Sequence, residues 1–329
     1  MARRLVTLVI VGLVLAATVA LAPKEEPAPV RLVFVGDMEL SNTPGEKIAK
    51  GEDPFSEFAD VLADCDASIG NLECTVATTG QPVKKPWTFR AHPQVLPVVA
   101  RHFTAVSLAN NHSGDFGHDA FRECLSLLPK HNILYFGGGA NIREARSPLI
   151  LKRNGLKIAL LGANDFKPRS FEAGPTWPGV AWCVDEQLEA DVRAARSVYH
   201  ADVVLPYLHW GWEEEPANDR QKALAHKLID AGADAIIGGH PHVVQEVEYY
   251  RGKPIYYSLG NFVFDGFSTK ETLLGWVLQL TVTKAGVVSW NTIPCRLDTT
   301  GVPHRAPEIE SPYGQANDPK IRWQSERQR

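Results

Sequence analysis

The sequence predicts an α/β fold, with one large domain at residues 31–301. Three observations lead to this prediction. Segments with strand character alternate with segments of helical periodicity in both halves of the 329-residue chain, which favours sheets flanked by helices. Asn154-Gly155 and Arg251-Gly252-Lys253 each separate two strand-like segments, as in β-hairpins. Apolar residues make up 44% and charged residues 22% of the chain, which excludes a disordered, collagen-like or multi-span membrane protein.

The first 22 residues predict a membrane anchor or a signal peptide. Arg3 and Arg4 precede Leu5–Ala22, a run of 18 uncharged residues that would span about 27 Å as a helix. Ala20-Leu21-Ala22 resembles a cleavage site, but Pro23 follows it directly. We therefore favour an uncleaved anchor over a cleaved signal, and a buried helix of the domain is the third alternative. The positive-inside rule places the rest of the chain outside the cytoplasm, secreted or periplasmic if the segment is cleaved.

After a short linker at 23–30, the first half of the domain alternates strands with helices. Buried strands are expected where apolar and β-branched residues run together, at Arg31–Val35, Ala67–Leu72, Phe103–Leu108 and Asn132–Phe136. Helices are expected where apolar residues recur every three or four positions, at Phe55–Leu62, Val95–His102 and His118–His131. Residues 77–94 contain three prolines, which predicts a long surface loop.

The second half adds hairpins to the same alternation. Strands are expected at Pro148–Arg153, Lys157–Gly162, Ala201–Leu208, Ala233–Ile237, Val243–Tyr250 and Pro254–Leu259, with two more near 273–283 and 286–295. Helices are expected at Asp185–Tyr199 and Asp219–Ala231. From residue 302 the chain is polar and contains prolines, so we expect 302–329 to be a frayed tail.

Charge and cysteine content limit the classes of partner and compartment. Lys and Arg total 34 and Asp and Glu total 38, so the net charge of −4 gives no electrostatic case for a nucleic acid as partner. The five cysteines are an odd number and form no CxxC pair. Cys65 and Cys74 flank a predicted strand that would hold them about 30 Å apart, too far for a disulfide. The cysteines are best explained as small buried apolar residues.

Polar residues follow the carboxyl ends of five predicted strands. In open α/β sheets ligands bind at this edge, so residues far apart in the sequence are expected to meet there. The five clusters are Gly36-Asp37, Asn71-Leu72-Glu73, Asn110-Asn111-His112, His209-Trp210-Gly211-Trp212-Glu213 and His240-Pro241-His242. If the last stretch is extended, the two imidazoles point the same way and can share one ion or two adjacent ions.

Carboxylate, amide and imidazole groups together predict a site for one or two divalent metal ions, such as Mn, Zn, Fe or Mg. Two ions about 3.5–4 Å apart would clamp the attacking and leaving oxygens of a phosphoryl group. Each cluster alone has an ordinary structural explanation: Asp37 could end a turn, Glu73 could be solvated, and His209 could be a hydrogen-bonded, half-buried imidazole. The shared position of the clusters at strand ends is what favours a common site.

At these residues the sequence resembles the bacterial capsule-synthesis CapA family, PGA_cap. Six motifs carry the resemblance in order between residues 31 and 266: Val35-Gly36-Asp37, Gly70-Asn71-Leu72-Glu73, Leu108-Ala109-Asn110-Asn111-His112 with Asp115 and Gly117, His209-Trp210-Gly211, Gly239-His240-Pro241-His242-Val243 and Tyr257-Ser258-Leu259-Gly260-Asn261-Phe262. That family is associated with poly-γ-glutamate biosynthesis and is similar to the calcineurin-like metallophosphoesterases. The resemblance implies a metallophosphatase-like four-layer αββα sandwich.

The resemblance also implies roles for individual residues. Asp37, Asn111, His209, His240 and His242 match metal ligands, and His112 matches the residue that protonates a leaving oxygen or stabilises the transition state. Two positions depart from the superfamily pattern: Glu39 stands in place of a histidine, and Asn71 stands in place of the carboxylate that bridges two metals. Glu73 is the candidate substitute bridge, or only one ion binds. Supporting roles are expected for Glu39, Asn71, Asn110, Asp115, Trp210 and Asn261.

The sequence leaves three functions open. The first is a membrane-anchored factor that acts on an anionic polymer such as poly-γ-glutamate, together with membrane synthase subunits. The second is a metal-dependent phosphoesterase or amidase at the cell surface, in which the metal lowers the pKa of water and His112 is the general acid. The third is a non-catalytic polymer-binding module, which the replacements at Glu39 and Asn71 would favour. Lys84, Lys85 and Arg90 are expected to be solvated loop residues.

Overall fold

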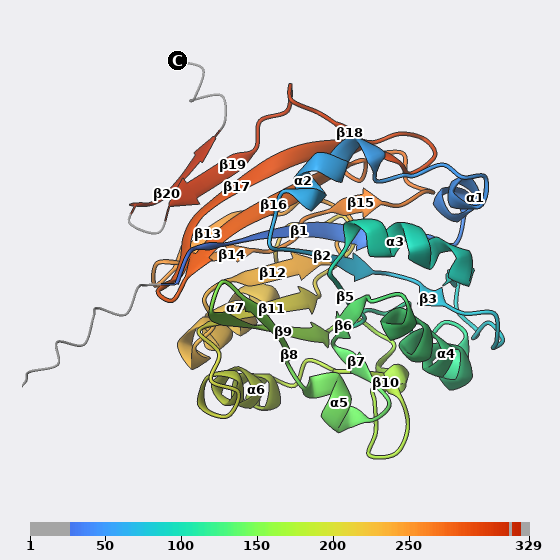
Figure 1. Ribbon diagram of the computed structural model, residues 1–329, viewed down its shortest axis with the longest axis horizontal. Coiled ribbons are helices and arrows are strands. Elements are labelled where there is room, and N and C mark those ends of the chain that lie inside the picture. The colour runs from blue at the N-terminus through green and yellow to red at the C-terminus, as the bar shows by residue number, and fades with distance from the viewer. Residues whose placement is uncertain (1–26, 316–317, 324–329) are drawn as a thin grey trace, which may run out of the picture.

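Two packed β-sheets form the centre of the computed structural model, which describes residues 27–315 and 318–323 (Figure 1). Within these residues the first sheet has ten strands. Eight of them follow one another in the order β20 (Asp318–Trp323), β19 (Pro312–Gln315), β17 (Gly286–Leu297), β16 (Leu274–Thr283), β1 (Val30–Met38), β2 (Ala67–Leu72), β5 (Ala105–Ser107) and β6 (Leu134–Phe136). Two short strands join this path, β15 (Asn261–Val263) beside β1 and β18 (Pro303–Arg305) beside β17.

The second sheet has six strands in the described residues. Their order is β13 (Val247–Tyr250), β14 (Lys253–Tyr256), β12 (Ile236–Gly239), β11 (Val203–His209), β9 (Leu156–Asn164) and β8 (Leu149–Arg153). Two small pairs lie outside both sheets, β3 (Thr75–Val76) with β4 (Arg90–Ala91), and β7 (Gly138–Gly139) with β10 (Gly179–Val180). Both predicted hairpins are confirmed, as β8–β9 and β13–β14.

Helices cover the outer faces of the two sheets (Figure 1). On the side of the first sheet lie α1 (Thr43–Ala49), η1 (Ser56–Phe58), α2 (Ala59–Ala63), η2 (Pro93–Val95), α3 (Leu96–His102) and α4 (Gly117–Lys130). On the side of the second sheet lie α6 (Asp185–Ser197) and α7 (Asp219–Ala231). The short helices α5 (Ile142–Arg146) and η3 (Arg169–Phe171) belong to the connections near β7 and β10. The predicted α/β class is thereby confirmed.

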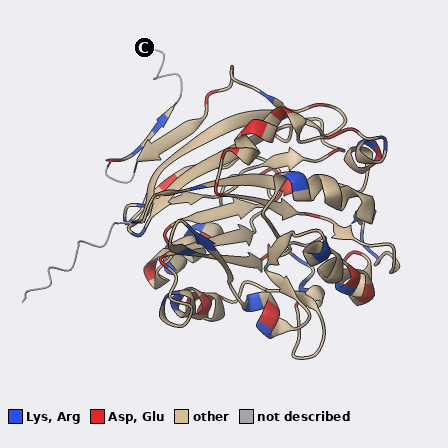
Figure 2. Ribbon diagram, in the orientation of Figure 1, with Lys and Arg blue, Asp and Glu red and all other residues tan. Residues whose placement is uncertain are grey.

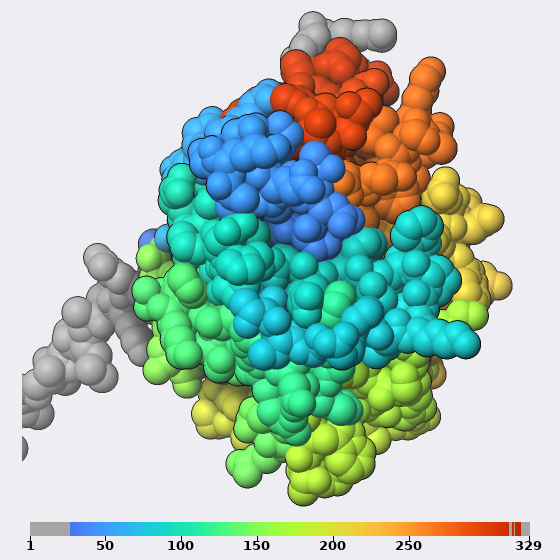
Figure 3. Space-filling view, turned by 90° about the vertical axis from the view of Figure 1, so that its right-hand side faces the viewer, coloured from blue at the N-terminus to red at the C-terminus, as the bar shows by residue number. Residues whose placement is uncertain are grey.

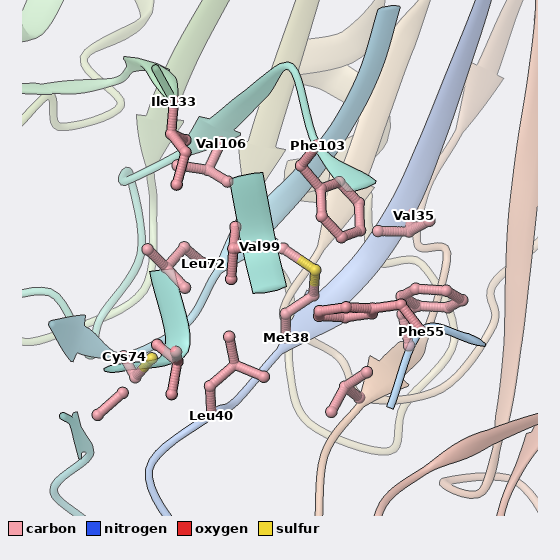
Figure 4. Packing of buried hydrophobic residues seen from close by; sticks show 14 of the residues in the cluster. Val35, Met38, Leu40, Phe55, Leu72, Cys74, Val99, Phe103, Val106 and Ile133 are labelled. Atoms are coloured by element: carbon pink, nitrogen blue, oxygen red, sulfur yellow. The ribbon is translucent and has the colours of Figure 1, made fainter. Parts of the chain in front are cut away.

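Strand β1 shows how the sequence builds these layers. Leu32 and Phe34 belong to the apolar cluster between the two sheets, whereas Val33 and Val35 belong to the cluster under the helices. Side chains alternate across a strand, so a strand that is apolar on both faces is buried on both. Figure 4 shows the helix side, where Val35, Met38 and Phe55 pack together.

The chain after residue 302 differs from its prediction. We expected a frayed tail, but its described part forms β18, β19 and β20, which extend the first sheet. Ser311 is fully buried, and its hydroxyl donates a hydrogen bond to the carbonyl of Thr292 in β17. These short strands of mixed polarity lack the apolar runs by which the other strands were predicted. They form by pairing with β17, or, in the case of β20, with β19.

The prediction for the first 22 residues is not tested by the structure. The predicted anchor or signal helix lies outside the described residues, and within these residues no helix is both long and apolar enough to cross a membrane.

All five cysteines are described and free, and four of them are buried. The explanation of the cysteines as small apolar residues is therefore confirmed. In Figure 2, Lys and Arg are interspersed with Asp and Glu along the ribbon.

Candidate functional site

The predicted polar clusters meet at one edge of the two sheets. Strands β1 and β2 run parallel, as do β11 and β12, so each pair places its carboxyl ends together. In the register of β1, Asp37 lies opposite both Asn71 of β2 and Asn261 of β15. His209 lies opposite Gly239, the residue before His240. Figure 3 looks onto this edge, where segments near residues 85, 213 and 266 border one another.

Asp37 links the two sheets. Its Oδ1 accepts a hydrogen bond of 2.8 Å from Nδ2 of Asn71, and its Oδ2 accepts one of 2.9 Å from the backbone N–H of His240. Nδ1 of His242 lies 3.6 Å from the same Oδ2. A Cβ at Gly239 would come within 2.5 Å of the Asp37 carboxylate, so only glycine allows this approach.

His209 points into the site because of strand alternation in β11. Leu205 and Tyr207 face the apolar cluster between the sheets, and His209 follows with the same two-residue period. Its Nε2 lies 2.7 Å from Oδ1 of Asn111 and 3.4 Å from Oε1 of Glu73. Nδ1 of His209 lies 3.0 Å from Nδ2 of Asn71.

The same alternation corrects the supporting role expected for Trp210. This side chain is fully buried in the cluster under α6 and α7, on the other face of the second sheet, where its Nε1 donates to the carbonyl of Tyr257. Neighbours along a strand point to opposite faces, so His209 and Trp210 cannot both enter the site. Trp210 is therefore a core residue.

His240 and His242 approach each other through a turn, which corrects the expectation of an extended stretch. Both have positive φ, 95° for His240 and 56° for His242, a conformation uncommon outside glycine. Their ring centroids lie 5.8 Å apart, and those of His209 and His240 lie 4.6 Å apart. The three imidazoles therefore share one region with Asp37.

Asn261, which was expected to support the site, contacts His242. Its Oδ1 lies 2.8 Å from Nδ1 of His242, and its Nδ2 donates to the carbonyls of His242 and Thr272. Since the amide oxygen is an acceptor only, Nδ1 of His242 carries the proton. The Nε2 atom of His242 is then left as the basic nitrogen, 3.9 Å from Oε1 of Glu73.

Several buried polar atoms of the site have no hydrogen-bond partner among the described residues. They are both carboxylate oxygens of Glu73 and both ring nitrogens of His240, and both residues are fully buried. Burying such atoms without partners is costly, which indicates that something else satisfies them. Glu73 belongs to two groups of three possible metal ligands. The first is Asp37, Glu73 and His242, and the second is Glu73, His209 and His240. Within each group the ligand atoms lie within 4.8 Å of one another. This set of donors fits a divalent cation.

Burial shifts the pKa values of these groups. It raises the pKa of Glu73 well above its ordinary value, and the negative charge of Asp37 adds to the effect. Burial also raises the pKa of Asp37, against the opposing influence of His242. It lowers the pKa values of His209 and His240 far below that of free histidine, and neighbouring imidazoles add to this. A bound cation would reverse the shift of the two carboxylates, because it favours their ionised form, and would act in the same direction as burial on the imidazoles, because it favours their neutral form.

His112 lies beside this group, in a network with Asp115 and Lys85. Nδ1 of His112 lies 2.6 Å from Oδ2 of Asp115, and Nζ of Lys85 lies 2.6 Å from Oδ1 of the same carboxylate. Nδ1 therefore carries the proton, and Nε2 is left for the cavity that His112 lines. Burial lowers the pKa of His112 to about 4, although the hydrogen bond to Asp115 opposes the shift.

Lys85 corrects one prediction. We expected a solvated loop residue, but its side chain is only 16% exposed, and Nζ also donates to the carbonyl of Asn111 at 2.9 Å. The loop before Arg90 is tied to the site at a second point, since the backbone N–H of Phe89 donates to Asp115. Arg90 lies over the ring of Phe116 and donates to the carbonyls of Thr79 and Gly80, so it too is held by the protein.

The remaining predicted supporting residues divide into two groups. Asn71 and Asn110 belong to the site, because Nδ2 of Asn110 donates to Oδ1 of Asn71 and its Oδ1 accepts from the backbone N–H of His112. Glu39 is buried as well, but its carboxylate accepts hydrogen bonds from the backbone N–H groups of Ser41 and Asn42. Burial raises the pKa of Glu39 to about 7. Glu39 stabilises the turn after β1, and it is absent from the groups of possible metal ligands in the described residues.

The sequence reasoning missed several residues around the site. Glu213 joins His240 and His242 in a third group of ligand atoms within 4.8 Å. Phe166 packs on the His240 ring at a centroid distance of 3.8 Å, and Phe89 packs on His112 at 4.3 Å. Glu213 stood within the predicted cluster that begins at His209, which was a usable signal. Nothing in the sequence alone pointed to the two phenylalanines.

The family that matches this chain and two of its relatives are named for capsule or PGA biosynthesis. The family described as bacterial capsule synthesis protein PGA_cap matches residues 31–266. The PGA biosynthesis protein CapA of Bacillus subtilis (strain 168) is 34% identical over 240 residues, which cover 70% of this chain and 62% of that protein. The chain thus spans less than two thirds of this relative's length. The capsule biosynthesis protein CapA of Bacillus anthracis is 30% identical over 289 residues, covering 82% of this chain and 70% of that protein.

Solved structures of low sequence identity share the fold. A hypothetical protein from Thermus thermophilus gives a TM-score of 0.53 at 16% identity, covering 80% of this chain and 98% of its own. A novel phosphatase from Mycoplasma pneumoniae gives 0.53 at 12% identity, covering 86% and 96%. At these identities the likeness concerns the fold alone.

Proposed function

The chain belongs to the bacterial capsule synthesis protein family PGA_cap, and on this premise we propose that it is an extracytoplasmic polymer-biosynthesis protein with a metal-dependent hydrolytic centre. Its polymer would be an anionic one such as poly-γ-glutamate, and residues 1–22 would anchor it beside the membrane synthase subunits. The relatives named for capsule and PGA biosynthesis support the first part of this proposal.

The observation that carries the hydrolytic centre is the set of buried atoms without partners. Glu73 and His240 are fully buried and offer two oxygens and two nitrogens that no described protein group satisfies. A non-catalytic fold would gain by replacing them with apolar residues or by pairing them. Glu73 belongs to both groups of ligand atoms, so it would help to hold the cation or cations at a site where Asn71 offers no carboxylate.

The residues of the chain would divide the work as follows. Asp37, Glu73, Asn111, His209, His240 and His242 would hold the cation or cations. When bound, a divalent cation lowers the pKa of a bound water and polarises the scissile phosphoester or amide. His112, with its Nδ1 proton fixed on Asp115, presents an unprotonated Nε2 to the cavity. This Nε2 would take up the proton that the attacking water releases and would then give it to the leaving oxygen or nitrogen. Asn261 fixes the ring of His242.

The experiment measures metal content and turnover on the same sample. The full chain in detergent is loaded with Mn²⁺ or Zn²⁺, dialysed, and tested for bound metal and for hydrolysis of bis-p-nitrophenyl phosphate. We expect bound metal and turnover in the wild type, and loss of both in His240→Ala. His226→Ala is the control, because His226 of α7 pairs with Glu248 of β13 and belongs to none of the ligand groups. Turnover that survives His240→Ala would refute the hydrolytic centre.

A second candidate function is a polymer-binding module without catalysis. The neutral Asn71 and the structural role of Glu39 favour it, because both stand where the wider superfamily has metal ligands. Full-length protein that binds the polymer but retains no metal after dialysis would establish this alternative. The role in polymer export is tested separately, by the amount and length of exported polymer after deletion of the gene.

A further inference from the structure

A cavity of about 410 Å³ opens directly beside the candidate site. His112 and His242 form part of its floor, so a group bound there would lie next to the proposed cations. The loop that carries Trp87 and Phe89 forms one wall, and the loop from Phe264 to Thr272 forms the other. Neither wall contributes a ligand atom to the groups around Glu73. The cavity therefore needs an explanation of its own.

Aromatic rings make up much of the cavity wall. The rings of Phe89 and Phe264 meet edge to face at 5.6 Å, and those of Phe264 and Phe267 lie 5.2 Å apart. His242 contacts both Phe264 and Phe267 at 4.8 Å. Trp87 is 72% exposed, the highest value among the large apolar side chains of the described residues. An indole left this exposed on a cavity wall has its face available to a ligand.

The charged groups of the cavity are all acidic. Glu213, Glu214 and Asp265 line it, and among the described residues no lysine or arginine does. Asp265 accepts a hydrogen bond from the backbone N–H of Thr43, Glu213 lies within 4.8 Å of ligand atoms of His240 and His242, and Glu214 forms no ion pair with a described residue. Lys85 is held by Asp115, which also contacts His112, and Lys85 is absent from the cavity lining. Carboxylates beside aromatic faces attract cations and repel anions.

We propose that this cavity binds an organic ammonium group of the substrate. The proposal rests on the hydrolytic function above and names part of its substrate. A phosphoester or amide lies at the cations, and a quaternary or primary ammonium lies between Trp87 and Glu214, with the carboxylate of Glu213 on the side of His240 and His242. The ring faces would bind the methyl or methylene surface of the cation, and the carboxylates would balance its charge. A run of carboxylates, as in poly-γ-glutamate, would be repelled from this cavity and must lie elsewhere.

The test compares a cation with its neutral isostere on the full chain. Choline and 3,3-dimethylbutan-1-ol have the same shape and differ in one charge. Binding of each is measured by calorimetry with EDTA present, so that the result does not depend on metal. We expect choline to bind at least about 10-fold more tightly than the alcohol, and Trp87→Ala and Glu214→Gln each to weaken choline by about 3- to 10-fold. Controls are Trp177→Ala and Glu186→Gln, which lie outside the cavity lining.

The outcomes separate this proposal from the hydrolytic one. Equal binding of choline and the alcohol, choline binding unchanged in Trp87→Ala, or tighter binding of tri-γ-glutamate than of choline would each overturn the ammonium site. With Mn²⁺ restored, phosphocholine should be hydrolysed faster than 3,3-dimethylbutyl phosphate. Hydrolysis of both esters at the same rate would refute the ammonium site and support the hydrolytic centre. Selective choline binding without hydrolysis of either ester would support the ammonium site and refute the hydrolytic centre.

Discussion

Asn261 of the first sheet holds His242, in the turn that follows β12 of the second sheet, through a contact of 2.8 Å between Oδ1 and Nδ1. The amide fixes both the tautomer and the ring plane of the imidazole, and its own Nδ2 is fixed by the carbonyl of Thr272 at 3.0 Å. Partners of this kind orient a metal ligand before the metal arrives. The site is therefore assembled across the interface of the two sheets.

Asn261→Ala should weaken metal binding without abolishing it. The imidazole loses its acceptor and its orientation, and we expect the dissociation constant for Mn²⁺ or Zn²⁺ to rise by about 10- to 100-fold, measured by competition with a chelator. Asn261→Asp keeps an acceptor for the imidazole and should recover part of the affinity. Asn141→Ala, which removes an exposed cap of α5, should leave metal affinity unchanged. Equal affinity in Asn261→Ala and wild type would contradict the positioning role.

Glu73→Gln should change stability in opposite directions with and without metal. In EDTA the substitution replaces a fully buried carboxyl whose oxygens accept no hydrogen bond from the described residues, so the melting temperature should stay constant or rise. With Mn²⁺ present, the wild type should gain several degrees and the variant should gain much less, because the cations lose their shared ligand. Calorimetric melting of both proteins in both buffers provides the measurement. A variant that melts earlier than wild type in EDTA would show that Glu73 has a structural partner.

Lys85→Met should destabilise the protein much more than Lys84→Met. Asp115 is buried, and removing its cation leaves a carboxylate that the low-dielectric interior does not solvate. We expect a loss of about 2–4 kcal/mol in the free energy of unfolding, measured with urea. Lys84 is its exposed neighbour, and its replacement should cost less than about 0.5 kcal/mol. Equal effects of the two substitutions would restore the view of Lys85 as a solvated loop residue.

His304 in β18 predicts a stability difference that depends on pH. Burial lowers the pKa of His304, but its hydrogen bonds to Glu57 and Asp298 outweigh burial and raise the pKa above that of free histidine. A raised pKa means that the stabilisation is complete below the unfolded value of about 6.5 and is lost as pH rises through the folded value. His304→Gln should therefore cost most near pH 5.5 and nothing near pH 9 in urea unfolding. A cost independent of pH, or the same profile in His131→Gln, would contradict this assignment.

The sequence predicted the bounds of a strand or helix correctly where the apolar pattern of that segment alone identifies it. The bounds of β2 and α7 match their prediction residue for residue, because each is a periodic apolar segment between clear breaks. The meeting of Asp37, His209 and His240 followed from a general property of parallel strands, whose carboxyl ends share an edge. In these cases local pattern and topology were enough.

Properties that depend on a distant partner were not predictable. Lys85 is largely withdrawn from solvent because the carboxylate of Asp115, 30 positions later, forms an ion pair with it. The sequence of a proline-containing loop does not identify that partner. The positive φ values of His240 and His242 arise from the turn that joins β12 to the following hairpin. The helices α1 and α5 were missed because seven and five residues are too short for a periodic pattern.

The strands after residue 302 have a practical consequence for expression of this protein. A truncation at residue 301, which a domain boundary drawn from the sequence invites, would remove β18 and β19 from β17 and leave its N–H and C=O groups open. Such a bare strand is a template for pairing with a second molecule, so the shortened protein should precipitate or form inclusion bodies. Affinity tags and crystallisation variants should therefore retain the chain at least through Trp323.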